Sequence, residues 1–340
     1  MPAVARHSRR RTHFLGLRTL VLLARALSVA VLLSLALPPF HAASAAQADT
    51  VVADVRSAVE AGDLGRASAI VIERRAQGST PAIAEALSVL GSAALAAGDL
   101  DRAIGWARDA ERTALDLLGS RPVESDAHLM SAIGAGIEVQ AQAVARQGDR
   151  SAALYFLQRE LETNEHTALH NKIQKNINLL TLAGSLAPPL DLSESLGVAP
   201  PTLESLKGRV VILFFWAHWC PDCKIQGPIL AALLDKYRAA GLTMVAPTQR
   251  YGYIEAGTPT PPDEELRHIV SVRDAYYPFL KAVPVPLSEN NHRRYGVSST
   301  PTLVVVDRRG VITLYHPGRM TEAELEEAVR PLLDARSGQQ

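Results

Sequence analysis

The sequence predicts a multidomain protein in which an all-helical domain is followed by an α/β domain. Its 340 residues suit about two domains, and 47% hydrophobic against 21% charged residues suits packed cores and excludes wholesale disorder. Apolar side chains recur at helical spacing up to about residue 183, whereas apolar runs typical of strands begin only after residue 200. The 35 basic and 35 acidic residues cancel, which argues against a nucleic-acid partner.

Residues 1–48 have the order of a secretory signal, which is positive, then apolar, then rich in small residues. They hold six arginines and no acidic residue, so 29 basic and 35 acidic residues are left for the rest of the chain. An apolar run from Ala26 to Leu37 precedes the small-residue stretch Ala42–Ala48, which suits cleavage. An uncleaved anchor over residues 15–37 is the alternative. Both alternatives export the remainder, so we expect a periplasmic protein, either free or anchored to the inner membrane.

Residues 49–185 are rich in Ala, Leu, Arg and Glu and form the predicted helical domain. Turn signals recur at Gly62-Asp63, Gly98-Asp99 and Gly148-Asp149, where the Gly can end one helix and the Asp can cap the next. This pattern resembles tetratricopeptide repeats. The spacings of 36 and 50 residues between the turns depart from the ~34 of that family, so an irregular helical bundle stays open as the alternative. The resemblance implies a surface for a protein partner and no chemistry.

The second domain, predicted over residues 188–336, begins at a composition shift around Pro188-Pro189. Its predicted strands are short apolar runs, which cover residues 210–216, 242–246, 302–306 and 311–315. The first run has no polar interruption, as expected of a central strand buried on both faces, and the last two predict a hairpin. A capping box at Thr321–Glu324 predicts the start of the last helix.

The chain has two cysteines, Cys220 and Cys223, and both follow the predicted central strand at the point where a helix begins. A thiolate at a helix N-terminus meets unpaired N–H groups and the positive end of the helix dipole, so we expect the pKa of Cys220 to fall below the ~8.5 of a free thiol. Cys220 is therefore expected to be the exposed attacking group, and Cys223 to resolve the mixed disulfide. Half of a zinc site is the alternative for one such pair, but zinc takes about four ligands and no second cysteine pair exists, so we expect no metal.

The segment Trp216–Cys223 between strand and helix resembles the thioredoxin superfamily and, within it, the exported TlpA/ResA group. The similarity covers roughly Pro188 to Leu333 and includes Thr300-Pro301 before a strand. It implies a thioredoxin-like fold and dithiol–disulfide exchange on client proteins, with no cofactor beyond the dithiol and with a membrane thiol reductase as electron donor. In that group the proline matching Pro301 is cis and faces the cysteines, which makes Pro301 and Thr300 expected substrate-binding residues.

Trp219 and Pro221, which flank Cys220, complete the expected substrate-binding set. Two further neighbours bear on the chemistry of the dithiol. The negative charge of Asp222 would raise the pKa of Cys220 and favour a reductant. His218 is interpreted as a solvated loop residue, with a pH-sensitive modulator as the alternative.

Two usual carboxylates are missing from this chain. Phe214 stands where thioredoxin keeps a buried Asp, and Gln226 stands where the TlpA/ResA group often has Glu. Cys223 would then lose its proton to water, to the leaving thiolate of the substrate or to Asp222.

The stretch 249–283 is interpreted as an insertion, with Tyr251 and Tyr253 followed by a helix from Asp263 to about Tyr276. Surface packing explains these tyrosines as well as substrate contact does, so they are not among the expected site residues. The sequence as a whole predicts an exported thiol-disulfide oxidoreductase that reduces protein disulfides, with the helical domain selecting a client. A disulfide oxidase or isomerase, and a non-catalytic scaffold with a vestigial redox domain, are the alternatives.

Overall fold

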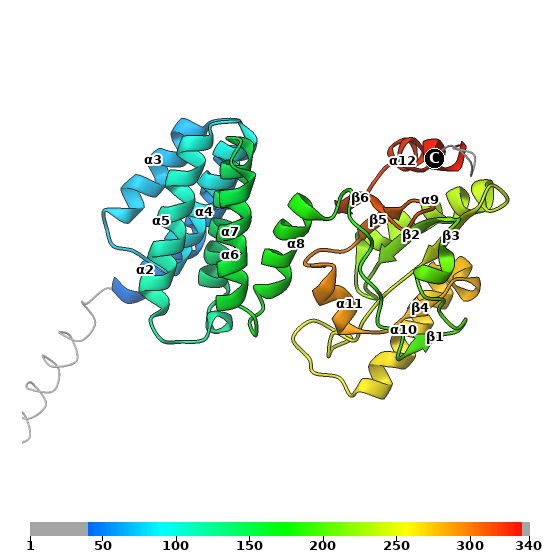
Figure 1. The fold of residues 1–340 in the computed structure, drawn as a ribbon. Coiled ribbons are helices and arrows are strands. Elements are labelled where there is room, and N and C mark those ends of the chain that lie inside the picture. The colour runs from blue at the N-terminus through cyan, green and yellow to red at the C-terminus, as the bar shows by residue number, and fades with distance from the viewer. Residues whose placement is uncertain (1–39, 335–340) are drawn as a thin grey trace, which may run out of the picture. The chain divides into compact units, whose positions relative to one another are not determined.

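The computed structural model describes residues 40–334 (Figure 1). Side chains are described from residue 50 onward. The predicted signal or anchor therefore lies outside the described residues, apart from its last nine residues, which fall in helix α2. No helix of the described part is both long and apolar enough to cross a bilayer. The chain from Val51 onward forms one compact unit, so the domain boundary near residues 185–188 stays a prediction.

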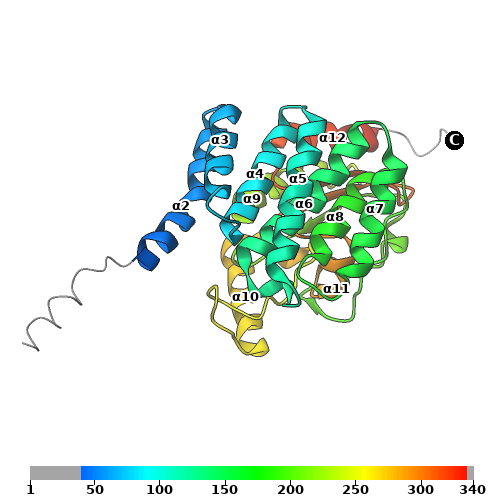
Figure 2. The same cartoon turned by 90° about the vertical axis from the view of Figure 1, so that its left-hand side faces the viewer.

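The N-terminal part of the described chain is helical, as predicted. Its α-helices are α2 (Phe40–Glu60), α3 (Leu64–Arg75), α4 (Pro81–Ala96), α5 (Leu100–Leu118), α6 (Ala127–Arg146), α7 (Arg150–Thr163) and α8 (His170–Thr181), with a short 3₁₀ turn at Val123–Ser125. Each helix from α4 to α8 packs on the next, and α6 also contacts α4 and α8 (Figure 2). Small residues allow the close approach. A Cβ added to Gly136 on α6 would lie 3.0 Å from the carbonyl oxygen of Ala107 on α5.

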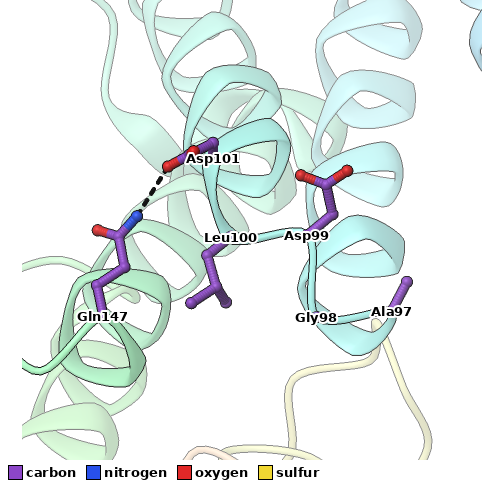
Figure 3. Close-up of a pocket in the computed structure, with 6 residues that line it drawn as sticks. All are labelled: Ala97, Gly98, Asp99, Leu100, Asp101 and Gln147. Carbon is purple, nitrogen blue, oxygen red and sulfur yellow. Dashed lines mark hydrogen bonds between the residues drawn. The ribbon is translucent and has the colours of Figure 1, made fainter.

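The three predicted Gly-Asp turns are present. Asp63, Asp99 and Asp149 each cap the following helix by accepting the backbone N–H three residues on, at 2.8, 3.2 and 2.9 Å. Beside the second turn, Gln147 at the end of α6 donates to Asp101 at 2.9 Å across a shallow hollow (Figure 3). The caps fix where each helix starts, and membership of the tetratricopeptide family stays a prediction.

The C-terminal part is built on a four-stranded sheet of order β3-β2-β5-β6. The strands are β2 (Val210–Phe215), β3 (Leu242–Val245), β5 (Thr302–Val306) and β6 (Ile312–Pro317), and a two-stranded sheet joins β1 (Ser195–Leu196) to β4 (Val285–Pro286). Strand β2 runs parallel to β3 and antiparallel to β5, and every residue of β2 and β5 is buried. This confirms the predicted central strand, and β5 and β6 form the predicted hairpin.

Helices of this part are α9 (Pro221–Tyr237), α10 (Pro262–Tyr276), α11 (Glu289–Arg294) and α12 (Glu322–Asp334), with 3₁₀ turns at Glu204–Leu206 and Pro278–Ala282. Helix α10 confirms the helix predicted within residues 249–283, and its first residue lies one position before the predicted start at Asp263. The predicted capping box precedes α12, where the Thr321 N–H donates to the Glu324 carboxylate at 2.7 Å and the Glu324 N–H donates back at 3.3 Å.

The sheet register brings two loops together. Phe215, the last residue of β2, pairs with Thr302, the first residue of β5. The chain leaving β2 toward α9 and the chain entering β5 therefore meet at the same edge of the sheet. The dithiol lies in the first of these loops and Thr300-Pro301 in the second.

Candidate functional site

Cys220 and Cys223 are joined by a disulfide at the start of α9, with Cα atoms 5.3 Å apart. Cys220 is the N-cap residue, and its sulfur accepts the N–H of Cys223 at 3.0 Å. Pro221 occupies the first turn, where its missing N–H leaves no hydrogen bond unmade. A negative charge on the Cys220 sulfur would therefore be stabilised by this N–H and by the helix dipole, as expected for the attacking group.

The second loop lies against the same sulfur. The Thr300–Pro301 peptide is cis, and the carbonyl oxygen of Thr300 is 3.3 Å from Sγ of Cys220. The structure thus brings together both cysteines and the Thr300-Pro301 pair, with Pro221 between the cysteines and Trp219 immediately before them. The substrate-binding roles of these residues stay predictions.

The expectation of an exposed attacking sulfur is wrong for the disulfide state. Cys220 is 1% exposed and Cys223 is 0% exposed, and both belong to the hydrophobic core that contains Trp216. The backbone of Thr300 contacts the Cys220 sulfur, while Trp219 is 42% exposed at the surface beside it.

His218 is also not the solvated loop residue that we expected, because it is 1% exposed. Its ring lies 5.7 Å from that of Tyr251, 6.2 Å from that of Tyr253 and 5.2 Å from that of His268, all three of which belong to the predicted insertion, residues 249–283. Neither ring nitrogen makes a hydrogen bond of good geometry within the described residues. Burial lowers the pKa of His218, and the nearby Glu265 carboxylate and the Tyr253 backbone act in the opposite direction.

The insertion packs on Trp219 as well. The Trp219 ring lies 5.3 Å from Tyr251 and 6.5 Å from Tyr253, stacked on the latter with an interplanar angle of 26°. Sequence reasoning left these two tyrosines out of the site. The signal that could have included them is their position directly after strand β3, at the sheet edge that β2 also reaches, because parallel strands end on the same side.

The two missing carboxylates are replaced by neutral buried groups. Phe214 is buried edge-on to Tyr277, with ring centroids 6.2 Å apart. Gln226 is 0% exposed; its Oε1 accepts the Met320 N–H at 2.8 Å, while its Nε2 has no partner in the described chain. No carboxylate of α9 is therefore buried next to Cys223.

Two other carboxylates, Asp222 and Glu265, act on residues of the Trp216–Cys223 segment or its partners. Asp222 is exposed and pairs with Arg319 at 3.2 Å, which weakens the argument that its charge raises the pKa of Cys220. Glu265 on α10 is buried and accepts the N–H groups of Tyr251 and Gly252 at 2.5 and 2.9 Å. Within residues 40–334 no group of three or more His, Cys, Asp or Glu side chains is placed to hold a metal ion.

Comparison with known proteins places the similarity in this C-terminal part. Residues 182–330 match the Redoxin family model. The chain is 29% identical over 144 residues to the thioredoxin-like protein YneN of Bacillus subtilis, which covers 42% of this chain and 76% of that protein. It is 26% identical over 130 residues to the thiol-disulfide oxidoreductase ResA of Bacillus cereus, which covers 38% of this chain and 67% of that protein.

Among solved structures, a putative thiol:disulfide interchange protein DsbE from Chlorobium tepidum is 25% identical, with a TM-score of 0.35. That match covers 44% of this chain and 97% of the other. The segment matched by the family model contains both cysteines and Pro301.

Proposed function

Because residues 182–330 form a thioredoxin-superfamily domain of the ResA-like group, we propose that this chain is a thiol-disulfide oxidoreductase acting on disulfides of client proteins. The observation that carries the proposal is the position of Cys220. Its sulfur caps α9, accepts the Cys223 N–H at 3.0 Å and lies 3.3 Å from the Thr300 carbonyl oxygen beside the cis proline.

The exchange proceeds in two steps, and each step breaks one disulfide bond and forms another. The Cys220 thiolate attacks a client disulfide, so that a bond forms between Cys220 and one client sulfur while the other client sulfur leaves as a thiolate. Cys223 then loses its proton and attacks the Cys220 sulfur, which closes the intramolecular disulfide and releases the second client thiolate. Two electrons move from the enzyme dithiol to the client disulfide, and a donor dithiol restores the enzyme.

We propose reduction as the direction in the cell, with export to the periplasm and a membrane thiol reductase as donor. The arginine-bearing leader, free of acidic residues, supports export, and export supplies disulfides to act on. The reduction potential separates this proposal from a disulfide oxidase. A value near the ~−270 mV of thioredoxin supports a reductant, and a value near the ~−120 mV of DsbA supports an oxidase.

We propose further that the helical part docks or selects a protein client. Its support is the series of capped Gly-Asp turns between closely packed helices, a construction that presents an extended surface to a partner.

Trapping tests the exchange reaction. In Cys223→Ser, the client stays bound to Cys220 because no thiol resolves the mixed disulfide, so complexes that a reductant releases are expected to accumulate. The matched control carries Cys220→Ser as well and has no thiol. A single variant that traps no more protein than the double variant would refute the proposed reaction and leave a non-catalytic scaffold.

A further inference from the structure

His218 is held close to Cys220 by a tight turn. The Cys220 N–H donates to the carbonyl oxygen of Ala217 at 3.2 Å, so His218 and Trp219 are the two central residues of that turn. Two chain steps place the Cα atoms of His218 and Cys220 within about 7 Å of each other. His218 and the reactive Cys220 therefore share one tight turn, two residues apart.

The ring nitrogens of this buried residue are poorly satisfied. Both are inaccessible to solvent, and neither makes a hydrogen bond of good geometry in the described part of the chain, although buried polar atoms are ordinarily paired. Among the described residues, the one polar group that acts on the ring by hydrogen bonding is the backbone of Tyr253, which opposes the lowering of the His218 pKa by burial. A phenyl ring would make the same edge contacts with the surrounding rings. Packing alone thus does not require an imidazole at this position. The Tyr253 backbone can engage one nitrogen, and the other is left to take up a proton.

Charged and titratable groups face the ring from three elements. Tyr251 and Tyr253 come from the loop after β3, Glu265 and His268 from α10, and Lys224 from α9. Glu265 is the one anion among them. It is buried and fixed by two backbone N–H groups, so a counter-charge for an imidazolium is already in place.

We propose that His218 is a positioning residue that stores one of the two protons taken up when the Cys220–Cys223 disulfide is reduced, and thereby keeps Cys220 as a thiolate. This inference rests on the proposed dithiol chemistry. In the oxidised state, burial keeps the ring neutral. Reduction creates a negative sulfur two residues away on the same turn. This charge adds to that of Glu265 and favours the imidazolium.

The proton and electron count closes. A donor dithiol supplies two electrons and two protons and leaves as a disulfide. The Cys220–Cys223 bond breaks, Cys223 takes one proton as a thiol, and His218 takes the other while Cys220 stays a thiolate. When a client disulfide is reduced, the departing client thiolates receive these two protons.

The test follows both partners in the reduced full-length chain. Imidazole NMR of the wild type is expected to show His218 titrating at least about one pH unit higher in the reduced protein than in the oxidised protein. In His218→Phe, the pKa of Cys220, measured from the pH dependence of alkylation, is expected to rise by about one pH unit. At a pH below the pKa, this rise is a tenfold loss of thiolate.

His268→Phe is the matched control, because it replaces the other imidazole of the same ring cluster while leaving His218 in place. Its thiolate titration is expected to stay within about 0.3 pH unit of the wild type. Identical Cys220 titrations in wild type and His218→Phe would overturn the inference. A His218 titration that is the same in the oxidised and reduced proteins would overturn it too. This second measurement uses the wild type, so it does not depend on whether a variant folds. Neither readout involves a client, so a failure of trapping alone would refute the proposed function and leave the proton store intact.

Discussion

Replacing Gln226 by glutamate is expected to speed the resolving step, in which Cys223 loses its proton. Cys223 and Gln226 are three residues apart on α9, which places their side chains side by side, with Cβ atoms about 5–6 Å apart. Gln226 Oε1 accepts the Met320 N–H, and a glutamate oxygen can accept it equally. The substitution therefore keeps the hydrogen bond that exists and exchanges an Nε2 without a partner for a base.

The magnitude of the gain follows from the role of a positioned base. General-base catalysis contributes about 10²–10⁴-fold where proton transfer limits a step. Because water or the leaving thiolate already takes this proton in the wild type, we expect a gain below that range, about tenfold at pH 7.

The same substitution carries a pH-dependent cost in stability. Burial would raise the pKa of the new carboxyl above its unfolded value of about 4.3. The variant is then most stable below pH ~4 and loses stability as the pH rises through the folded-state pKa, by about 1.4 kcal/mol for each pH unit that separates the folded and unfolded pKa values. A folded-state pKa two pH units above the unfolded value would make unfolding at pH ~8 require about 3 kcal/mol less than at pH ~4, relative to the wild type.

The assay mixes reduced protein with a chromogenic aryl disulfide and follows the two bursts of released thiol, the second of which reports resolution by Cys223. Gln226→Met is the control, since it removes the amide without supplying a base and is expected to give no acceleration. If Gln226→Glu resolves at the wild-type rate and its urea unfolding shows no added pH dependence, residue 226 does not exchange protons with Cys223 and the reasoning fails.

Two further substitutions test the packing around the site. Gly227→Ala would place a Cβ 2.8 Å from the ring of the fully buried Tyr277 and is expected to lower the free energy of unfolding, measured by urea titration, by about 1–3 kcal/mol. The control is Gly105→Ala, in open space on α5, which should raise the free energy of unfolding by about 0.5–1 kcal/mol. Equal effects of the two substitutions would contradict this account. Burial lowers the pKa of His292 to about 4, so the protein should lose up to about 3 kcal/mol of stability as the pH falls from ~6.5 toward 4, because the unfolded chain binds the proton first. The loss should shrink in His292→Gln, and an unchanged pH slope in that variant would show that another group is responsible.

Local patterns predicted the parts of this molecule that local physics determines. The uninterrupted apolar run at 210–216 became the buried strand β2, and the Gly-Asp turns became capped helix starts because a carboxylate three residues before an N–H satisfies it. The cysteines lie at the strand–helix junction, where the sequence places them between an apolar run and the start of a helix. The match of residues 182–330 to the Redoxin family, with relatives in the ResA group, confirms the thioredoxin-like fold and the enzyme class.

What the sequence did not reveal depends on contacts between distant segments. The chain around His218 predicts a solvated residue because it reads as a short loop, yet Tyr251 and His268 cover the ring from 33 and 50 residues away. The burial of Cys220 against the Thr300 carbonyl has the same origin, since 80 residues separate the two groups. No periodicity encodes such a contact.

The burial of His218 and the burial of Cys220, which the sequence did not predict, are physically connected. A sulfur that is 1% exposed develops its negative charge where little water can solvate it, so the protein itself has to supply the stabilisation and receive the proton. The N-terminus of α9 stabilises the negative charge through the Cys223 N–H. The exposed side chains of Asp222 and Arg319 pair with each other at the surface. The insertion that seals the loop also brings Glu265 and surrounds His218, so the element that excludes water also carries the groups able to replace it.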